Sequence, residues 1–232
     1  RLVRDDFGPA PRKEFYPDPD LPKGFRRATP NDYNGSGFDR GHMSPNGDMA
    51  NRTSQYESFS LANMIPQNPQ NNRHVWAEIE SAVRRLAEKD GELYVITGPA
   101  FLGQDLQKIG NVLVPTYIYK VVYSPKRQQA AAYFIKNEDT SHYQALSVTQ
   151  LENTLRIDLL PGVPKRIKDV AMPLPGAGAG QHGARNAPEK REDPAAQVKK
   201  IEADLLTRLF NDAMKVFLNF ITNLIHKGWS HV

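Results

Sequence analysis

Two runs rich in Val, Ile, Tyr and Phe constrain the fold of this chain most strongly. They cover residues 112–123 and 129–136, and a short Pro125-Lys126-Arg127 turn joins them. β-Branched and aromatic residues favour strands, and two such runs across a short turn predict a hairpin. Residues 93–97 have a similar composition. We therefore expect an α+β fold built on a central, mostly antiparallel sheet.

The clearest helix is predicted over residues 72–89. Its apolar residues recur at a spacing that places them on one helical face, and Gly91 follows as a residue typical of a helix end. These apolar positions are Trp76, Ile79, Val83 and Leu86. Residues 38–43 are expected to form a strand that enters a hairpin with Asn46-Gly47 at its tip.

Two capping-box pairs predict shorter helices. Ser54 with Glu57 indicates a helix that ends near Asn63, and Thr149 with Glu152 indicates one that ends before Pro161.

Three segments are expected along the chain. Residues 1–174 should form one compact body, and residues 175–194, rich in Gly, Ala and mixed charges, should form a flexible linker. Residues 195–232 should form an amphipathic helix. The apolar positions of that helix are Val198, Ile201, Leu205, Leu209, Phe217, Ile221 and Leu224.

Composition excludes several classes of protein. The chain has no Cys, which excludes disulfides, Cys-based zinc sites and thiol catalysis. The net charge of +4 permits a nucleic-acid partner without indicating one. No apolar run approaches the length of a transmembrane span, and the first residues do not read as a signal peptide.

Candidate catalytic residues begin in the stretch Phe38-Asp39-Arg40-Gly41-His42. In an extended strand alternate side chains face the same side, so Arg40 and His42 should do so. A cation beside an imidazole can hold a phosphate and deprotonate a water molecule next to it. The alternative is a surface arginine and a structural histidine.

The helix at 72–89 adds Asn72, Glu80 and Arg84. At about 100° per residue, these three flank the apolar stripe on one side of the helix. One amide oxygen and one carboxylate are too few ligands for Ca²⁺ but suit Mg²⁺, which keeps most of its water. Alternatively, Glu80 and Arg84 form an ordinary surface pair, and Asn72 could also cap the helix.

Taken together, these residues resemble those of the DNA/RNA non-specific endonucleases. The similarity rests on the D-R-G-H at 39–42 and on Asn63-Met64-Ile65-Pro66-Gln67 with Asn71-Asn72-Arg73 and Trp76, and it covers about residues 15–170. That family has the ββα-metal fold and includes secreted bacterial sugar-non-specific nucleases and mitochondrial endonuclease G.

The resemblance implies a role for each matching residue. His42 would be the general base, Asn72 the direct protein ligand of Mg²⁺, and Glu80 the carboxylate that holds metal-bound water. Arg84 would contact the scissile phosphate, as would Arg40 from the D-R-G-H motif, while Asp39 would brace the motif. The upstream substrate-binding arginine has no certain counterpart, Arg12 being one position out of register, and the segment 152–156 lacks the usual Thr-Gly.

The function expected from this resemblance is a metal-dependent endonuclease. It would hydrolyse DNA and RNA with Mg²⁺, or Mn²⁺ as a substitute, contact mainly backbone phosphates, and leave 5′-phosphate and 3′-hydroxyl ends. Because bacterial members of this family are secreted, the resemblance implies secretion or periplasmic export of this protein. The sequence does not identify a protein inhibitor.

Two alternatives stay open at this point. The chain could be a non-catalytic nucleic-acid-binding module, or an effector that targets a partner or a membrane through its final helix. That helix could fold back on the body, mediate self-association through Leu205, Leu209, Phe217 and Ile221, or contact lipid.

Overall fold

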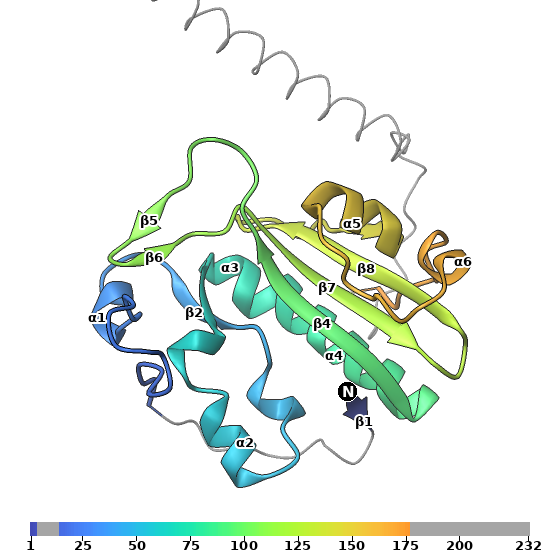
Figure 1. Cartoon of the computed structure of the whole chain (residues 1–232), viewed down its shortest axis with the longest axis horizontal. Coiled ribbons are helices and arrows are strands. Elements are labelled where there is room, and N and C mark those ends of the chain that lie inside the picture. Colours follow the sequence, from blue (N-terminus) through green and yellow to red (C-terminus); the bar gives the residue numbers. More distant parts are fainter. Residues whose placement is uncertain (4–13, 177–232) are drawn as a thin grey trace, which may run out of the picture. The chain divides into compact units, whose positions relative to one another are not determined.

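The computed structural model of this protein describes residues 1–3 and 14–176 (Figure 1). Its main sheet has five strands in the order β1-β4-β7-β8-β9, and every neighbouring pair is antiparallel. These strands are β1 (Leu2–Val3), β4 (Glu92–Ala100), β7 (Tyr117–Ser124), β8 (Gln129–Lys136) and β9 (Gln144–Leu146). The α+β fold with a mostly antiparallel central sheet, predicted from the sequence, is confirmed.

The central hairpin is the one that the two apolar runs predict. Strand β7 pairs with β8 from Tyr117↔Lys136 to Ser124↔Gln129 across the predicted turn. The predicted strand at 112–123 is interrupted, however: β6 (Val112–Leu113) pairs with β5 (Lys108–Ile109) outside the main sheet. Pro115 lies in the interruption, and proline lacks the N–H that an internal strand position needs.

Helices cover both faces of the main sheet (Figure 1). Helix α4 (Ala77–Asp90) packs on one face, and α5 (Val148–Leu155) with α6 (Lys165–Lys168) on the other. Side chains alternate along β7, so Ile118 and Val122 lie in the cluster with α4, and Tyr119 and Val121 lie in the cluster with α5. Lys120 shares the α4 face, since its Nζ lies 5.0 Å from the centre of the Trp76 ring.

The predicted helix at 72–89 is present with one added feature. A π-helical turn, η4 (Asn72–Trp76), follows the short α3 (Pro69–Asn71) and leads directly into α4. Gly91 caps the end of α4 at φ 87°, a left-handed conformation that glycine adopts without steric cost.

The partner of the strand at 38–43 was predicted wrongly. Strand β2 (Asp39–His42) pairs antiparallel with β3 (Met64–Gln67), and Asn46-Gly47 lies in a 3₁₀ turn, η2 (Asn46–Asp48), rather than at a hairpin tip. Between the two strands the chain also forms α2 (Arg52–Glu57) and the 3₁₀ turn η3 (Leu61–Asn63).

Both capping-box predictions were displaced along the chain. Asn51, not Ser54, caps α2, because its side chain accepts a hydrogen bond from the Ser54 N–H, and α2 ends at Glu57. Ser147 with Gln150 forms the box of α5. Glu152 instead accepts hydrogen bonds from the Leu159 N–H and Lys168 Nζ.

Several expectations fall partly or wholly outside the described residues. The final helix at 195–232, the linker beyond residue 176 and Arg12 lie outside them. The described residues also include the short helix α1 (Pro30–Tyr33). No helix among the described residues is long and apolar enough to cross a membrane.

Candidate active site

The candidate site is built on a ββα unit formed by β2, β3 and the continuous η4–α4 helix. Gly41 lies opposite Ile65 in the β2–β3 pair, and a Cβ on Gly41 would approach Gln67 Cβ to 2.7 Å. Any larger residue would therefore displace the Gln67 side chain, which is fully buried. The glycine of the D-R-G-H sequence thus allows the two strands to pack closely.

Buried amides connect this unit to the main sheet. Gln67 Nε2 donates to Asn71 Oδ1 at 2.8 Å, and Asn71 Nδ2 donates to the Lys136 carbonyl of β8 at 2.9 Å. Asn137, just after β8, donates from Nδ2 to the Pro66 carbonyl at 2.9 Å. Because buried polar groups need partners, these bonds hold the start of the helix in one position on the sheet.

Asp39 joins the strand to the start of the helix. Its carboxylate accepts hydrogen bonds from Asn72 Nδ2 at 3.0 Å and from Arg73 Nε at 2.8 Å and Nη2 at 2.6 Å. Burial raises the pKa of Asp39, but the hydrogen bonds from Arg73 and Asn72 outweigh it and hold that pKa below its ordinary value. The ionised Asp39 is therefore a brace, as the sequence indicated.

The same contact orients the Asn72 amide. Since Nδ2 donates to Asp39, the assignment of amide nitrogen and oxygen is determined by the network, and Oδ1 is the atom directed away from Asp39. An amide oxygen held in this way is a suitable ligand for a hard divalent cation.

His42 lies at the end of β2 against two aromatic rings. Its ring centre is 5.2 Å from that of Phe59, edge-on, and 5.9 Å from that of Phe15. Burial lowers the pKa of His42 to about 4, so the imidazole is neutral at pH 7. Among the described residues, no hydrogen-bond partner is found for its buried Nε2.

Arg40 shares the His42 side of β2, as predicted, because both side chains contact Phe15. Its guanidinium, however, is held by protein groups. Nη2 donates to the Pro30 carbonyl at 2.9 Å and to Asn34 Oδ1 at 3.0 Å, and the rings of Phe15 and Tyr33 lie 5.2 and 5.3 Å away. The structure therefore uses Arg40 to hold the segment around α1.

Glu80 and Arg84 lie one turn apart on α4. Their side chains are 15% and 27% exposed, and Arg84 Nη2 is 3.8 Å from Glu80 Oε2. Burial raises the pKa of Glu80 to about 7, although Lys120 and Arg84 act to lower it. The Glu80–Arg84 pair is thus more buried than the ordinary surface ion pair considered as an alternative to a functional site.

Two charged residues beside this pair were missed by sequence reasoning. Asp48 of η2 accepts a hydrogen bond from Arg84 Nε at 2.5 Å. Lys120 is 2% exposed, and its Nζ donates to Thr97 Oγ1 at 2.7 Å. A lone lysine within the apolar run of β7 was the available signal for Lys120, whereas no local pattern distinguishes Asp48.

The oxygen atoms around α4 fit a sparsely liganded divalent cation. In residues 1–3 and 14–176, no group of three or more His, Cys, Asp or Glu side chains could hold a metal ion. One amide oxygen from Asn72 and one carboxylate from Glu80 match the preference of Mg²⁺ for few protein ligands and several waters. They do not suit Zn²⁺, which needs three or four His, Cys or carboxylate ligands.

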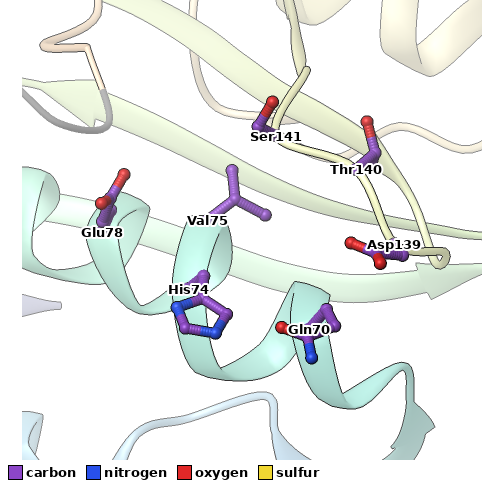
Figure 2. Close-up of a pocket in the computed structure, with 7 residues that line it drawn as sticks. All are labelled: Gln70, His74, Val75, Glu78, Asp139, Thr140 and Ser141. Carbon is purple, nitrogen blue, oxygen red and sulfur yellow. The ribbon is translucent and has the colours of Figure 1, made fainter.

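A cavity of about 320 Å³ lies apart from these residues (Figure 2). It lies between the helix and the loop after β8, and Val75 points toward that loop from the helix. Its lining residues are Gln70, His74, Val75, Glu78, Asp139, Thr140 and Ser141. No predicted site residue is among them, so the chemistry is assigned to the β2–α4 cluster and not to this cavity.

Comparison with known proteins finds similarity to nucleases. The chain is 46% identical to Nuclease C1 of Cunninghamella echinulata var. echinulata over 134 residues, which is 52% of each protein. It is 39% identical to mitochondrial Nuclease EXOG of Danio rerio over 134 residues, 52% of this chain and 39% of that protein. The chain thus spans about half or less of the length of these curated relatives.

A solved structure and a family profile extend the match. The crystal structure of the EndoG/EndoGI complex superposes with a TM-score of 0.65 at 26% identity, covering 72% of this chain and 78% of that one. The profile of the DNA/RNA non-specific endonucleases matches residues 3–166, which include the whole ββα unit. This chain belongs to the DNA/RNA non-specific endonuclease family.

Proposed function

We propose that the protein is a Mg²⁺-dependent endonuclease that hydrolyses phosphodiester bonds of DNA and RNA and leaves 5′-phosphate and 3′-hydroxyl ends. The observation that carries this proposal is the Asp39–Asn72 hydrogen bond at 3.0 Å. It joins the strand that bears His42 to the helix that bears Asn72, Glu80 and Arg84. A base and an oxygen ligand, distant in sequence, thereby belong to one rigid unit.

His42 would act as the general base. Its lowered pKa of about 4 keeps the imidazole unprotonated at pH 7, and its buried Nε2 has no partner among the described residues that would compete for the proton. An unprotonated imidazole can accept a proton from a water molecule as that water attacks phosphorus.

Asn72 and Glu80 would hold the metal ion, Asn72 directly through Oδ1 and Glu80 through metal-bound water. When bound, Mg²⁺ supplies Lewis-acid stabilisation of charge on the 3′ leaving oxygen, and Mn²⁺ could substitute for it. Among the residues of the chain itself, Arg84 would neutralise the nonbridging phosphate oxygens. We assign Arg40 mainly to the support of the α1 segment, because its Nη2 is bonded to the Pro30 carbonyl and to Asn34 Oδ1.

Contacts to the phosphate backbone carry little sequence information. We therefore propose cleavage that is largely independent of sequence and that weakens as the salt concentration rises. We propose that the protein is secreted or exported to the periplasm.

A digest of plasmid DNA, single-stranded DNA and RNA tests the function. With Mg²⁺, supercoiled plasmid should be nicked and then linearised, EDTA should abolish this, and end-labelling should find 5′-phosphates. Binding to the plasmid without metal-dependent nicking would instead identify a non-catalytic nucleic-acid-binding module and overturn the proposal.

A further inference from the structure

The Arg84 guanidinium is bound by the carboxylate of Asp48, which lies in η2 and not in the helix of Arg84. Its Nε donates to Asp48 Oδ1 at 2.5 Å, and the two side chains are only 27% and 14% exposed. A charged hydrogen bond with little exposure is stronger and geometrically more restrictive than a surface ion pair. The pair therefore restricts where the guanidinium can point.

The turn that carries Asp48 is itself rigid. The Asp48 N–H donates to the Pro45 carbonyl at 3.0 Å, and the Met49 N–H donates to the Asn46 carbonyl at 3.2 Å. A Cβ on Gly47 would lie 3.4 Å from Arg84 Nη2, so the turn backbone packs directly against the guanidinium. The carboxylate of Asp48 thus comes from a short, hydrogen-bonded turn and not from a long loop.

The remaining guanidinium nitrogens differ in their surroundings. Nη2 is 3.8 Å from Glu80 Oε2, beyond hydrogen-bond distance. Among the described residues, Nη1 has no hydrogen-bond partner. With Nε held by Asp48, the two terminal nitrogens are the donors that remain for an anionic ligand.

Four ionisable side chains meet around Arg84. Asp48 and Glu80 supply two carboxyl groups beside Arg84 and the buried Lys120. Without the charge of Asp48, Glu80 would be the carboxylate left to pair with Arg84. The guanidinium would then be free to turn toward Glu80, which lies 3.8 Å from its Nη2.

We infer that Asp48 is a positioning residue that holds the Arg84 guanidinium in place for the scissile phosphate. This inference rests on the proposed function, in which Arg84 contacts that phosphate. Asp48 itself touches neither substrate nor metal in this scheme, and its whole effect is exerted through Arg84.

A double-mutant cycle on the full chain tests the inference. The wild type, Asp48→Asn, Arg84→Ala and the double variant are assayed for kcat and KM on plasmid DNA with Mg²⁺. Asp48→Asn keeps the size of the side chain and an oxygen that can accept from Nε, but it removes the charge. We expect it to lower kcat about tenfold or more, since small misplacements of catalytic groups have large effects on rate. In the Arg84→Ala background the same change should alter kcat by less than about twofold, because residues that act through one another are not additive.

A matched control separates position from charge. Glu138→Gln also removes one carboxylate, from an ion pair in which both side chains are more than half exposed, and it should leave kcat unchanged. If Asp48→Asn melts below the assay temperature, Asp48→Glu serves instead. It keeps the charge but moves the carboxylate by one methylene, and the same contrast between the two backgrounds is required.

The outcomes distinguish this inference from the proposed function. An equal fall in kcat in both backgrounds would show that Asp48 acts independently of Arg84 and would overturn the inference. So would full activity of Asp48→Asn beside a strongly impaired Arg84→Ala, with the proposed function left intact. A wild-type chain that cleaves nothing would remove the proposed function itself.

Discussion

At the scale of single residues, the structure gives Arg40 and Arg84 different hydrogen-bond partners, although the sequence predicted a phosphate contact for both. Arg40 is bound to the Pro30 carbonyl and Asn34 and lies against two aromatic rings. Arg84 keeps its terminal nitrogens beside Glu80 at the candidate site. The two identical side chains therefore have different partners, from which we infer different roles.

This difference predicts opposite effects of two substitutions. Arg40→Ala should lower the free energy of unfolding by about 2 kcal/mol, through lost charged hydrogen bonds and cation–π contacts. Arg84→Ala should lower kcat strongly while the folded protein persists at the assay temperature. Urea denaturation and plasmid nicking, measured on both variants, test these two predictions. A stable but inactive Arg40→Ala would show that Arg40 contacts the phosphate instead.

His42 gives the second prediction at this scale. His42→Ala should lower kcat by about 10² or more, the usual effect of losing a general base. The variant should still fold and unfold cooperatively, with a melting temperature lowered only by the lost ring contacts with Phe59 and Phe15. Near wild-type nicking by this variant would remove His42 from the mechanism.

At the scale of elements, the end of α4 is tied to the β7–β8 turn. The Asp90 carboxylate is 3% exposed and accepts from Arg127 Nε at 2.6 Å, Arg127 Nη2 at 2.8 Å and Ser124 Oγ at 2.8 Å. An acidic residue in the last turn opposes the helix dipole, so Arg127 also offsets that cost. The contact anchors the helix that carries Glu80 and Arg84 to the sheet.

We expect Asp90→Asn to lower the free energy of unfolding at pH 7 by about 2 kcal/mol. The hydrogen bond from Arg127 holds the pKa of Asp90 below its ordinary value, so the unfolded chain takes up this proton first as pH falls. The difference between wild type and variant should therefore be full above about pH 4 and disappear as pH falls through the folded pKa.

Denaturation curves between pH 3 and pH 7 measure this difference. Glu138→Gln is the control, because both side chains of the Lys136–Glu138 pair are more than half exposed and the pair should contribute little. A difference for Asp90→Asn that stayed constant down to pH 3 would contradict the assignment.

At the scale of the whole molecule, the candidate site and its supports lie within residues 14–176. The three hydrophobic clusters and all five predicted site residues belong to residues 1–3 and 14–176, and the family match ends at residue 166. We therefore expect the proposed chemistry to need the described body and not the predicted linker or final helix.

A chain shortened to residues 1–176 should keep its melting temperature and its plasmid-nicking rate. Light scattering on the full and shortened chains tests self-association through the predicted final helix, since only an associating helix changes the number of subunits. Loss of folding in the shortened chain would show that residues beyond 176 complete the core.

The sequence predicted what short-range patterns determine. Helix α4 with its Gly91 cap, strand β8 and the β7–β8 turn follow from periodicity, turn chemistry and residue type within a few neighbouring positions. The same holds for the alternation that places Arg40 and His42 on one side of β2. The resemblance, carried by D-R-G-H together with residues 63–67, 71–73 and Trp76, led to the correct family.

Tertiary structure decided which distant groups meet. Nothing local to residues 38–43 indicates that β3 will be their partner strand, or that Asp48 and Lys120 will lie beside Arg84 and Glu80. Strand pairing and buried charge pairs depend on packing between segments far apart in the chain, and a local pattern contains no information about such a partner. The sequence therefore showed which residue types are present, but only the folded chain showed that Arg40 bonds to the α1 segment and Arg84 to Asp48.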